Sequence, residues 1–231
     1  MQVFVLRPEP GNAATCKAAR EAGLDPVAMP LQQIEAAEWQ MPEGAFDGLL
    51  IGSANAIRHG GPRLNELRDL PVHAVGARTA EAAQSAGFKV ATVGSGGLQA
   101  VIDTLPARAT SLLRLSGEER VELDLPDHVA IAERSVYRLA PLDPSAQSIA
   151  ALRQGGCALL HSASALRRLV EVCESHEIHR GTIALAALGP RILAAAGEGW
   201  HSIHTADAPS DAALLALARR ICETSSRNAH G

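Results

Sequence analysis

The sequence predicts an α/β fold made of two similar domains, each with a mostly parallel sheet, joined by a two-stranded linker. Short apolar runs alternate with helical segments along the chain, which is the pattern of βαβ units and parallel sheets. Residues 49–58 return in similar form at residues 158–167. A strand and a helix at the N-terminus stand outside both copies, which indicates that one of the two domains is discontinuous.

The expected strands are short apolar runs, and the helices begin at residues that can cap their first turn. Arg7-Pro8 ends the first strand, and Gly23 closes the first helix. Up to residue 139, the sequence predicts strand 3–6, helix 10–22, extended segment 26–34, strand 48–51, a helix capped by Ser53, strand 72–75, helix 78–86, strand 89–93, a helix that opens at glycines 94–97 and ends at 105, strand 111–115 and extended stretch 129–139. After Pro141 and Pro144 it predicts helix 145–153, strand 157–160, helix 163–174, strand 182–188, helix 190–197, strand 201–205 and helix 209–222.

The internal repeat indicates two units of similar structure. Ser53 precedes Ser162 by 109 residues, and Gly76 precedes Gly189 by 113 residues, so the offset drifts by the length of a loop. This period is far too long for a solenoid repeat. The second copy lacks a first strand of its own, and the N-terminal strand and helix can supply it.

The domain boundaries follow from that assignment. One domain comprises residues 1–33 and 140–231, and the inserted domain comprises residues 40–130. The linker strands, 34–39 and 131–139, are long enough to pair as a ribbon. We expect hinge motion between the domains, because interfaces between domains of one chain are usually small.

Composition excludes several classes of partner. The net charge is −4 and aromatic residues make up 3%, which supplies neither a basic surface nor a stacking platform for nucleic acid. The four cysteines form no CxxC pair, which favours a reducing compartment. No apolar run is long enough to span a membrane, and the N-terminus has no signal-peptide pattern. We therefore expect a cytoplasmic protein.

Small, hydroxyl, amide and glycine residues follow the strands. The ends of parallel strands are where open α/β sheets bind ligands, and exposed N–H groups at helix starts favour anions. Helix capping alone also explains a serine at such a place, so both interpretations stay open. These segments are Gly52-Ser53-Ala54-Asn55, Gly76-Ala77-Arg78-Thr79, Gly94-Ser95-Gly96-Gly97, Ser116-Gly117-Glu118, His161-Ser162-Ala163-Ser164 and Gly189-Pro190-Arg191.

Other catalytic or cofactor motifs are missing. The sequence has no GxxxxGK[ST], and the glycines at 94–97 do not complete GxGxxG. His176 and His179 lack a third ligand, and His201 and His204 face opposite sides of a strand, so we expect no metal. No GxSxG motif or Ser/His/Asp set is apparent.

The order of segments resembles the uroporphyrinogen-III synthase family across nearly the whole chain. The matching segments are Val5-Leu6-Arg7-Pro8-Glu9-Pro10-Gly11, Asp47-Gly48-Leu49-Leu50-Ile51-Gly52-Ser53-Ala54-Asn55-Ala56, Val75-Gly76-Ala77-Arg78-Thr79-Ala80-Glu81, Leu113-Arg114-Leu115-Ser116-Gly117-Glu118, Val136-Tyr137-Arg138, Leu160-His161-Ser162-Ala163-Ser164 and Leu188-Gly189-Pro190. The resemblance implies two α/β domains with a two-stranded linker, the first domain discontinuous. It also implies a monomer that uses no cofactor.

The resemblance implies a substrate and a reaction. The substrate is hydroxymethylbilane, a linear tetrapyrrole with carboxylates on every ring. The product is uroporphyrinogen III, formed by loss of water, inversion of the last ring through a spiro intermediate, and closure of the macrocycle. Catalysis then depends mostly on holding the chain in the conformation that closes.

The resemblance also assigns roles to residues. Tyr137, the only tyrosine, matches the family tyrosine whose phenol protonates the departing hydroxyl, although linker packing would also explain it. Substrate carboxylates are expected at Ser53, Ala54, Asn55, Gly76, Thr79, Ser116, Gly117, Ser162, Gly189 and Arg191. Leu6, Gly52 and Ile192 depart from the threonines common in the family. Two alternatives stay open, a non-catalytic two-lobed binding protein and a regulatory relative.

Overall fold

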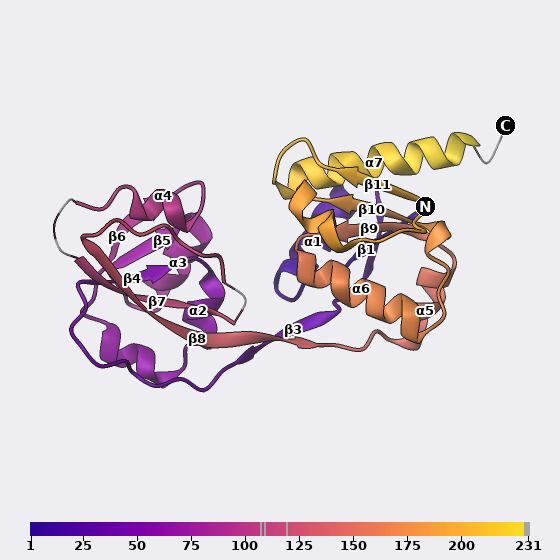
Figure 1. The fold of residues 1–231 in the computed structure, drawn as a ribbon. Coiled ribbons are helices and arrows are strands. Elements are labelled where there is room, and N and C mark those ends of the chain that lie inside the picture. Colours follow the sequence, from indigo (N-terminus) through magenta and orange to yellow (C-terminus); the bar gives the residue numbers. More distant parts are fainter. Residues whose placement is uncertain (107, 109, 119, 229–231) are drawn as a thin grey trace. The chain divides into compact units, whose positions relative to one another are not determined.

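The computed structural model describes residues 1–228 except 107, 109 and 119. The chain separates into two compact units, residues 1–33 with 140–231 and residues 34–139. Each unit is a mostly parallel sheet with helices on both faces (Figure 1). The α/β fold class expected from the sequence is therefore confirmed.

The first unit has a five-stranded sheet in the order β11-β10-β9-β1-β2. All described pairings in it are parallel. The N-terminal strand β1 lies inside the sheet, between β2 and β9, because every one of its residues from Val3 to Val5 is apolar and fully buried. The strands are β1 (Gln2–Val5), β2 (Asp25–Ala28), β9 (Gly156–Leu160), β10 (Ile183–Ala187) and β11 (Ser202–Thr205).

Helices cover both faces of the first sheet. One face packs on α1 (Gly11–Glu21) and α7 (Asp211–Asn228). The other face packs on α5 (Ala146–Arg153), α6 (Ala163–Ser175) and the 3-10 helix η3 (Pro190–Ala195). A short 3-10 turn, η2 (Arg180–Thr182), leads into β10. Because the central strands are buried on both faces, they read as continuous apolar runs in the sequence.

The second unit has a six-stranded sheet in the order β3-β8-β7-β4-β5-β6. The strands are β3 (Gln32–Ala36), β4 (Gly48–Ile51), β5 (Val72–Val75), β6 (Val90–Gly94), β7 (Thr110–Gly117) and β8 (Val129–Pro141). One face packs on α2 (Ala54–His59), the 3-10 helix η1 (Pro62–Leu67) and α3 (Ala77–Ser85), and the other on α4 (Leu98–Ile102).

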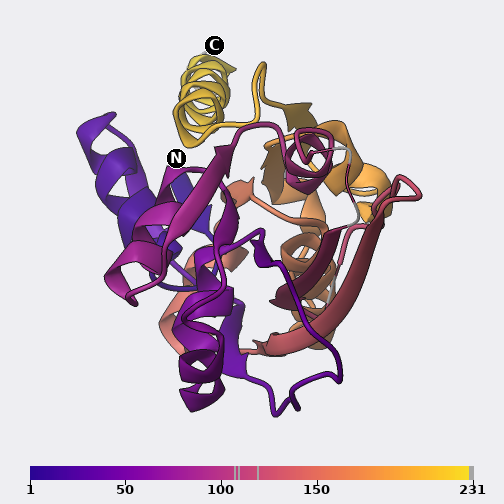
Figure 2. The ribbon, with the colours of Figure 1, turned by 90° about the vertical axis from the view of Figure 1, so that its left-hand side faces the viewer.

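The strand β8 does more than link the units. It has 13 residues and pairs in parallel with β7, so it extends the sheet of the second unit. Figure 2 shows it as the long curved strand in dark red. The edge strand β3 lies against β8, where the Ala37 N–H donates to the Val136 carbonyl at 3.0 Å and Arg138 pairs with Glu35 at 3.0 Å. These two pairs run in opposite directions along the strands, so β3 and β8 are antiparallel.

Some boundaries expected from the sequence are wrong. The segment 190–197 is a 3-10 helix that ends at Ala195, because Gly197 with φ +66° follows and none of the helix residues is fully buried. The helix after Gly97 ends at Ile102, and the extended segment 26–34 divides into β2 and β3. The 3-10 helix η1, which begins at Pro62, was not expected.

The two sheets are related by exchange of parts. The strand order matches when β11, β10, β9, β1 and β2 are paired with β6, β5, β4, β7 and β8. Phe4 pairs with Ala158 in the first sheet, and the residues 109 positions from each, Leu113 and Leu49, pair in the second. The pattern is that of a tandem duplication in which each copy divides between the units. The first copy supplies β1 and β2 to the first unit and β4, β5 and β6 to the second, and the second copy supplies β7 and β8 to the second unit and β9, β10 and β11 to the first.

Candidate functional site

The predicted site segments gather at one edge of each sheet. In the second unit, Ser53 follows β4, Gly76 follows β5, and Ser116 and Gly117 end β7. In the first unit, Ser162 follows β9 and Gly189 follows β10. Because the paired strands are parallel, these residues lie at the carboxyl edges, where α/β sheets bind ligands.

Two of the three predicted serines are helix caps. Ser53 Oγ accepts from the Asn55 N–H at 3.2 Å, and Ser162 Oγ accepts from the Ala165 N–H at 3.2 Å. Ser162 Oγ also lies 3.1 Å from Ser164 Oγ. Each hydroxyl therefore already satisfies a backbone donor of the helix that follows it. The recurrence of serine at both places is explained by the recurrence of the cap.

Three other predicted residues of the second unit differ in exposure. Thr79 is 4% exposed and Ala54 is 9% exposed, so both side chains pack inside the unit. Asn55 is partly exposed, and its Oδ1 accepts from Arg58 at 3.5 Å. Gly76 begins α3 with φ +77°, a backbone conformation that favours glycine.

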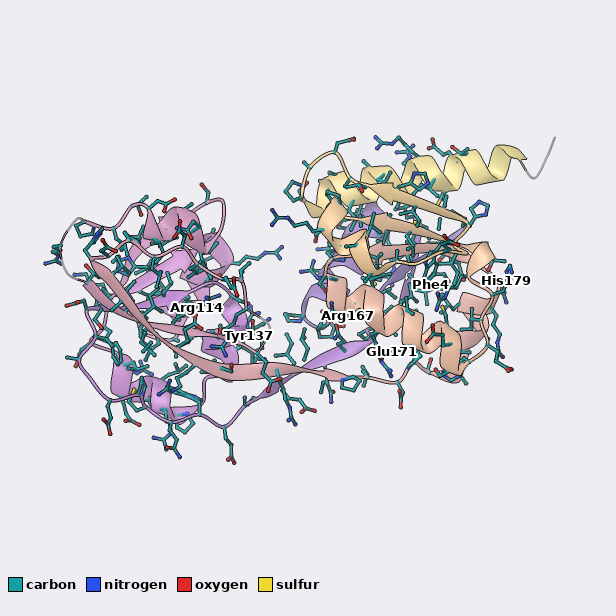
Figure 3. The ribbon with its side chains drawn as sticks, in the orientation of Figure 1. Phe4, Arg114, Tyr137, Arg167, Glu171 and His179 are labelled. Carbon is teal, nitrogen blue, oxygen red and sulfur yellow. The ribbon has the colours of Figure 1, made fainter. Side chains whose placement is uncertain are left out.

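Tyr137 lies beside Gly117 near the end of β8. A Cβ on Gly117 would stand 2.7 Å from Cε2 and 2.9 Å from Cζ of the ring. The register of β7 and β8 shifts between Ser116 and Gly117, so that Gly117 pairs with Tyr137. Figure 3 labels Tyr137 on β8 and Arg114 on the neighbouring strand β7. Glycine is therefore the residue that lets the phenol ring lie over the end of β7.

The ring of Tyr137 contacts a histidine. The centroids of the His59 and Tyr137 rings are 6.4 Å apart, at an interplanar angle of 46°. Burial, and then the Arg58 charge, lower the pKa of His59 below 6.5, which favours a neutral imidazole. Among the described residues, the Tyr137 hydroxyl has no hydrogen-bond partner. The phenol proton therefore stays available to a ligand.

His59 also borders a groove of about 920 Å³ within the second unit. Trp39, Arg63 and Arg134 line it with the segment 36–40 and the turn at 59–63. Trp39 Nε1 donates to the Gly60 carbonyl at 2.8 Å, and Arg134 Nε donates to the Gln40 carbonyl at 2.9 Å. These bonds hold the walls of the groove in place. No sequence pattern indicated this groove, because its walls come from three separate segments.

A polar cluster in the first unit was also missed from the sequence. Arg7 Nη1 lies 3.1 Å from Asp211 Oδ2 and 3.3 Å from Oδ1, and Thr15 Oγ1 donates to Oδ2 at 3.3 Å. His161 Nε2 lies 3.2 Å from Asp211 Oδ1, but off the direction of an aligned hydrogen bond. The His161 contact, and then Arg7 and Thr15, lower the pKa of Asp211 to about 2 although burial raises it. Arg7 and His161 follow strands and therefore lie in segments that the sequence singled out, whereas no sequence pattern indicated Asp211.

The remaining predicted residues of the first unit, Gly189 and Arg191, are not enclosed by other side chains. Gly189 is extended, with φ −167°, and a Cβ there would meet nothing within 4 Å. Arg191 is exposed, and no described residue pairs with its guanidinium group. Glycine is therefore not required at 189, and Arg191 is a cation available to an anionic ligand.

The residues that depart from the family pattern have structural surroundings. Leu6 is fully buried in the core against α5 and α6, and Ile192 packs against the same cluster. A Cβ on Gly52 would stand 3.1 Å from Leu98 Cδ1. Each of these three residues therefore fits the packing around it.

The described residues offer neither a metal centre nor a membrane-spanning helix. They contain no group of three or more His, Cys, Asp or Glu side chains placed to hold a metal ion. No helix among residues 1–228, with 107, 109 and 119 set aside, is both long enough and apolar enough to cross a membrane.

Known proteins similar to this chain share one description. The family model "Uroporphyrinogen-III synthase HemD" matches residues 13–216. The solved uroporphyrinogen-III synthetase of Helicobacter pylori is 19% identical, with a TM-score of 0.65 over 96% of this chain and 100% of that chain. A mutant uroporphyrinogen III synthase from the extremely thermophilic bacterium Thermus thermophilus is 17% identical, with a TM-score of 0.51 over 96% of this chain and 99% of that chain. No curated protein sequence matches. At these identities the two structures support the fold alone.

Proposed function

The chain belongs to the uroporphyrinogen-III synthase family, and we propose that it closes hydroxymethylbilane into uroporphyrinogen III with Tyr137 as the proton donor. The observation that carries the activity is the family match over residues 13–216. The role of Tyr137 is a further proposal, supported by its free hydroxyl beside Gly117.

The proposed reaction needs one proton transfer and control of conformation. The Tyr137 O–H protonates the departing hydroxyl of the substrate, which leaves as water while the pyrrole becomes a cationic, N-protonated azafulvene. The substituted carbon of the last ring then attacks, and the spiro intermediate rearranges with inversion of that ring. A proton lost when the new pyrrole regains aromaticity returns to the phenolate. Positioning accounts for most of the rate, because the azafulvene forms readily without a strong acid.

The carboxylates of the substrate are proposed to bind at the carboxyl edges of the sheets. Side-chain contacts are assigned to Asn55, Ser116 and Arg191, which are partly or fully exposed. Ser53 and Ser162 contribute mainly by fixing the first turns of their helices. Backbone N–H groups are assigned to Ala54, Gly117 and Gly189. The Gly76 N–H already donates to the Gly94 carbonyl at 2.9 Å, so Gly76 would contribute by setting the start of α3. Thr79 would contribute through its helix, since its side chain is buried.

The proposal includes the setting in which the enzyme works. We place it in the cytoplasm as a monomer whose reaction uses no cofactor. Cys16, Cys157, Cys173 and Cys222 form no disulfide in the described part of the chain, which supports a reducing compartment. Sedimentation at several concentrations tests the monomer.

An isomer assay tests the activity. Hydroxymethylbilane is generated in situ by its own synthase, the protein is added, and the oxidised type I and type III uroporphyrins are separated. The wild type should give mainly type III, and Tyr137→Phe should lower the rate while the melting temperature stays close to that of the wild type. Type I alone from folded protein would refute the enzyme and leave a binding or regulatory protein. Unchanged turnover in Tyr137→Phe would leave that residue a packing role.

A further inference from the structure

Arg7 is fixed in the first unit with one side of its guanidinium group occupied. Nη1 contacts both carboxylate oxygens of Asp211, at 3.1 and 3.3 Å, and lies 3.4 Å from Thr15 Oγ1. The backbone of Arg7 is fixed as well, because the fully buried Asn12 side chain donates to its carbonyl at 3.2 Å. Both ends of the side chain are therefore held.

The guanidinium group lies over Gly11, at the start of α1. A Cβ on Gly11 would stand 2.8 Å from Cζ and would also overlap Nε. The absence of a side chain at this position thus makes room for the flat group. The side chain of Arg7 is 25% exposed, so solvent reaches part of it.

The other side of the guanidinium group is open. Neither Nε nor Nη2 donates to any residue that the structure describes, and neither is fully enclosed. Nε–H and Nη2–H together form one of the paired donor edges of arginine, which matches the two oxygens of a carboxylate. Asp211 binds Nη1 and makes no contact with the Nε–Nη2 edge.

The position of Arg7 in the fold is one where ligands bind. Arg7 follows β1, and β1 pairs with β9. From this pair, β1 leads through α1 to β2 on one side, and β9 leads through α6 to β10 on the other. The helices α1 and α6 pack on opposite faces. The boundary between β1 and β9 is therefore the point where strand order reverses, and open α/β sheets bind ligands there.

We propose that the Nε–Nη2 edge of Arg7 binds one carboxylate of the tetrapyrrole, and that Asp211 is the positioning residue that aims this edge. The inference rests on the proposed function for the identity of the ligand. Helix capping explains the positions of Ser53 and Ser162, but it does not explain the position of Arg7. The contact would be bidentate and charge-assisted, so its loss should weaken binding by about tenfold or more.

Asp211 suits this positioning role over the working pH range. Its pKa of about 2 keeps the carboxylate ionised at neutral pH, so the orientation of Arg7 does not change with pH there. Thr15 of α1 donates a hydrogen bond to Asp211, and His161, which follows β9, lies within 3.2 Å of it, while Asp211 itself begins α7. The acid thus binds Arg7 in a fixed direction without competing for the open edge.

The test compares binding and turnover in matched variants. Arg7→Met removes the charge, and Arg7→Lys keeps the charge but removes the paired donors. Arg219→Met removes an arginine two turns along α7 from Asp211, whose partner is Glu223 at 2.9 Å in an exposed pair outside the cluster. Isothermal titration calorimetry measures the Kd of full-length protein for uroporphyrinogen III, kept reduced, and the isomer assay gives KM and kcat. Melting temperatures report the folded fraction.

The expected result is a Kd and a KM raised about tenfold or more in Arg7→Met, with a smaller increase in Arg7→Lys. Arg219→Met should equal the wild type in both. A purely structural Arg7 would lower the melting temperature and leave the Kd of the folded protein unchanged, which would overturn the inference. Should Arg7→Met fail to fold, a Kd in Arg7→Lys equal to that of the wild type would overturn it.

The outcomes separate this inference from the proposed activity. Binding that depends on Arg7 without type III product would refute the activity and keep the carboxylate site. Type III product with equal Kd values in all variants would keep the activity and refute the site. Absence of both binding and conversion in the wild type would refute the two together.

Discussion

Replacing Gly117 by alanine tests whether the position of the Tyr137 ring controls activity. The added Cβ would stand 2.7 Å from Cε2, 2.9 Å from Cζ and 3.2 Å from the hydroxyl oxygen. Ordinary contact needs about 3.4 Å or more, so the ring must move by roughly 0.7 Å. Gly117 lies within the paired strand β7, so the cost comes from this steric overlap.

The magnitude follows from that displacement. Overpacking at such a contact costs about 1–3 kcal/mol of the free energy of unfolding. Misplacing a reacting group by about 1 Å can lower turnover by roughly 100-fold, so we expect kcat to fall about 10- to 100-fold. Gly189→Ala is the matched control for stability, because its Cβ meets nothing within 4 Å and its backbone is extended. It should leave the free energy of unfolding close to the wild-type value.

The assay measures kcat and the ratio of type III to type I product in four proteins. These are the wild type, Gly117→Ala, Tyr137→Phe and the double variant. If Gly117→Ala acts by moving the phenol, the double variant should lose little more activity than Tyr137→Phe alone, since the two losses share one cause. Wild-type kcat in Gly117→Ala, or losses that multiply in the double variant, would refute the reasoning.

Three further predictions concern stability. Asp211→Asn removes a carboxylate whose pKa falls from 3.8 to about 2 on folding. This shift corresponds to a contribution to the free energy of unfolding of at most about 2.4 kcal/mol, and about 1–2 kcal/mol after allowance for the 35% exposure of the side chain, which the variant should lose. Because the folded pKa is the lower one, this stability is present above about pH 4 and is lost as the pH falls toward 2, so urea midpoints of wild type and variant should converge there. Ser162→Ala should cost about 1 kcal/mol through the lost cap while KM stays unchanged, and a raised KM would instead assign the hydroxyl to the substrate. Gly76→Ala should cost about 1 kcal/mol or more because φ is +77°, measured by thermal unfolding, and an unchanged melting temperature would contradict that reading of the backbone.

Local sequence patterns were sufficient for most elements of the fold. Strands such as Gly156–Leu160 are buried on both faces, so each appears as an uninterrupted apolar run. Serine caps predicted the starts of α2 and α6 correctly, because the cap bond joins residues two or three positions apart. Patterns failed where packing decides, as in η3, which is rich in apolar residues but has none fully buried and forms a 3-10 helix in place of an α-helix.

The length of β8 depended on a distant partner. Its residues 129–141 mix polar and apolar side chains without regular alternation, which fits a linker as well as a sheet strand. β8 is a sheet strand because it pairs with all eight residues of β7. This pairing depends on backbone hydrogen bonds, which amino-acid composition does not encode. The bulge that sets Gly117 opposite Tyr137 belongs to the same pairing.

By itself the sequence determined the α/β class, the duplicated pattern and the segments that follow each strand, because apolar periodicity and helix caps are short-range properties. Only the tertiary structure decided which side chains meet. Arg7 and Asp211 are 204 residues apart in sequence, and their contact exists because β1 enters the sheet beside β9 while α7 packs across the same face as α1. The contact between Gly117 and Tyr137 likewise exists only because β7 and β8 pair in one register. Periodicity defines the elements, and the way they pack brings the residues of a site together.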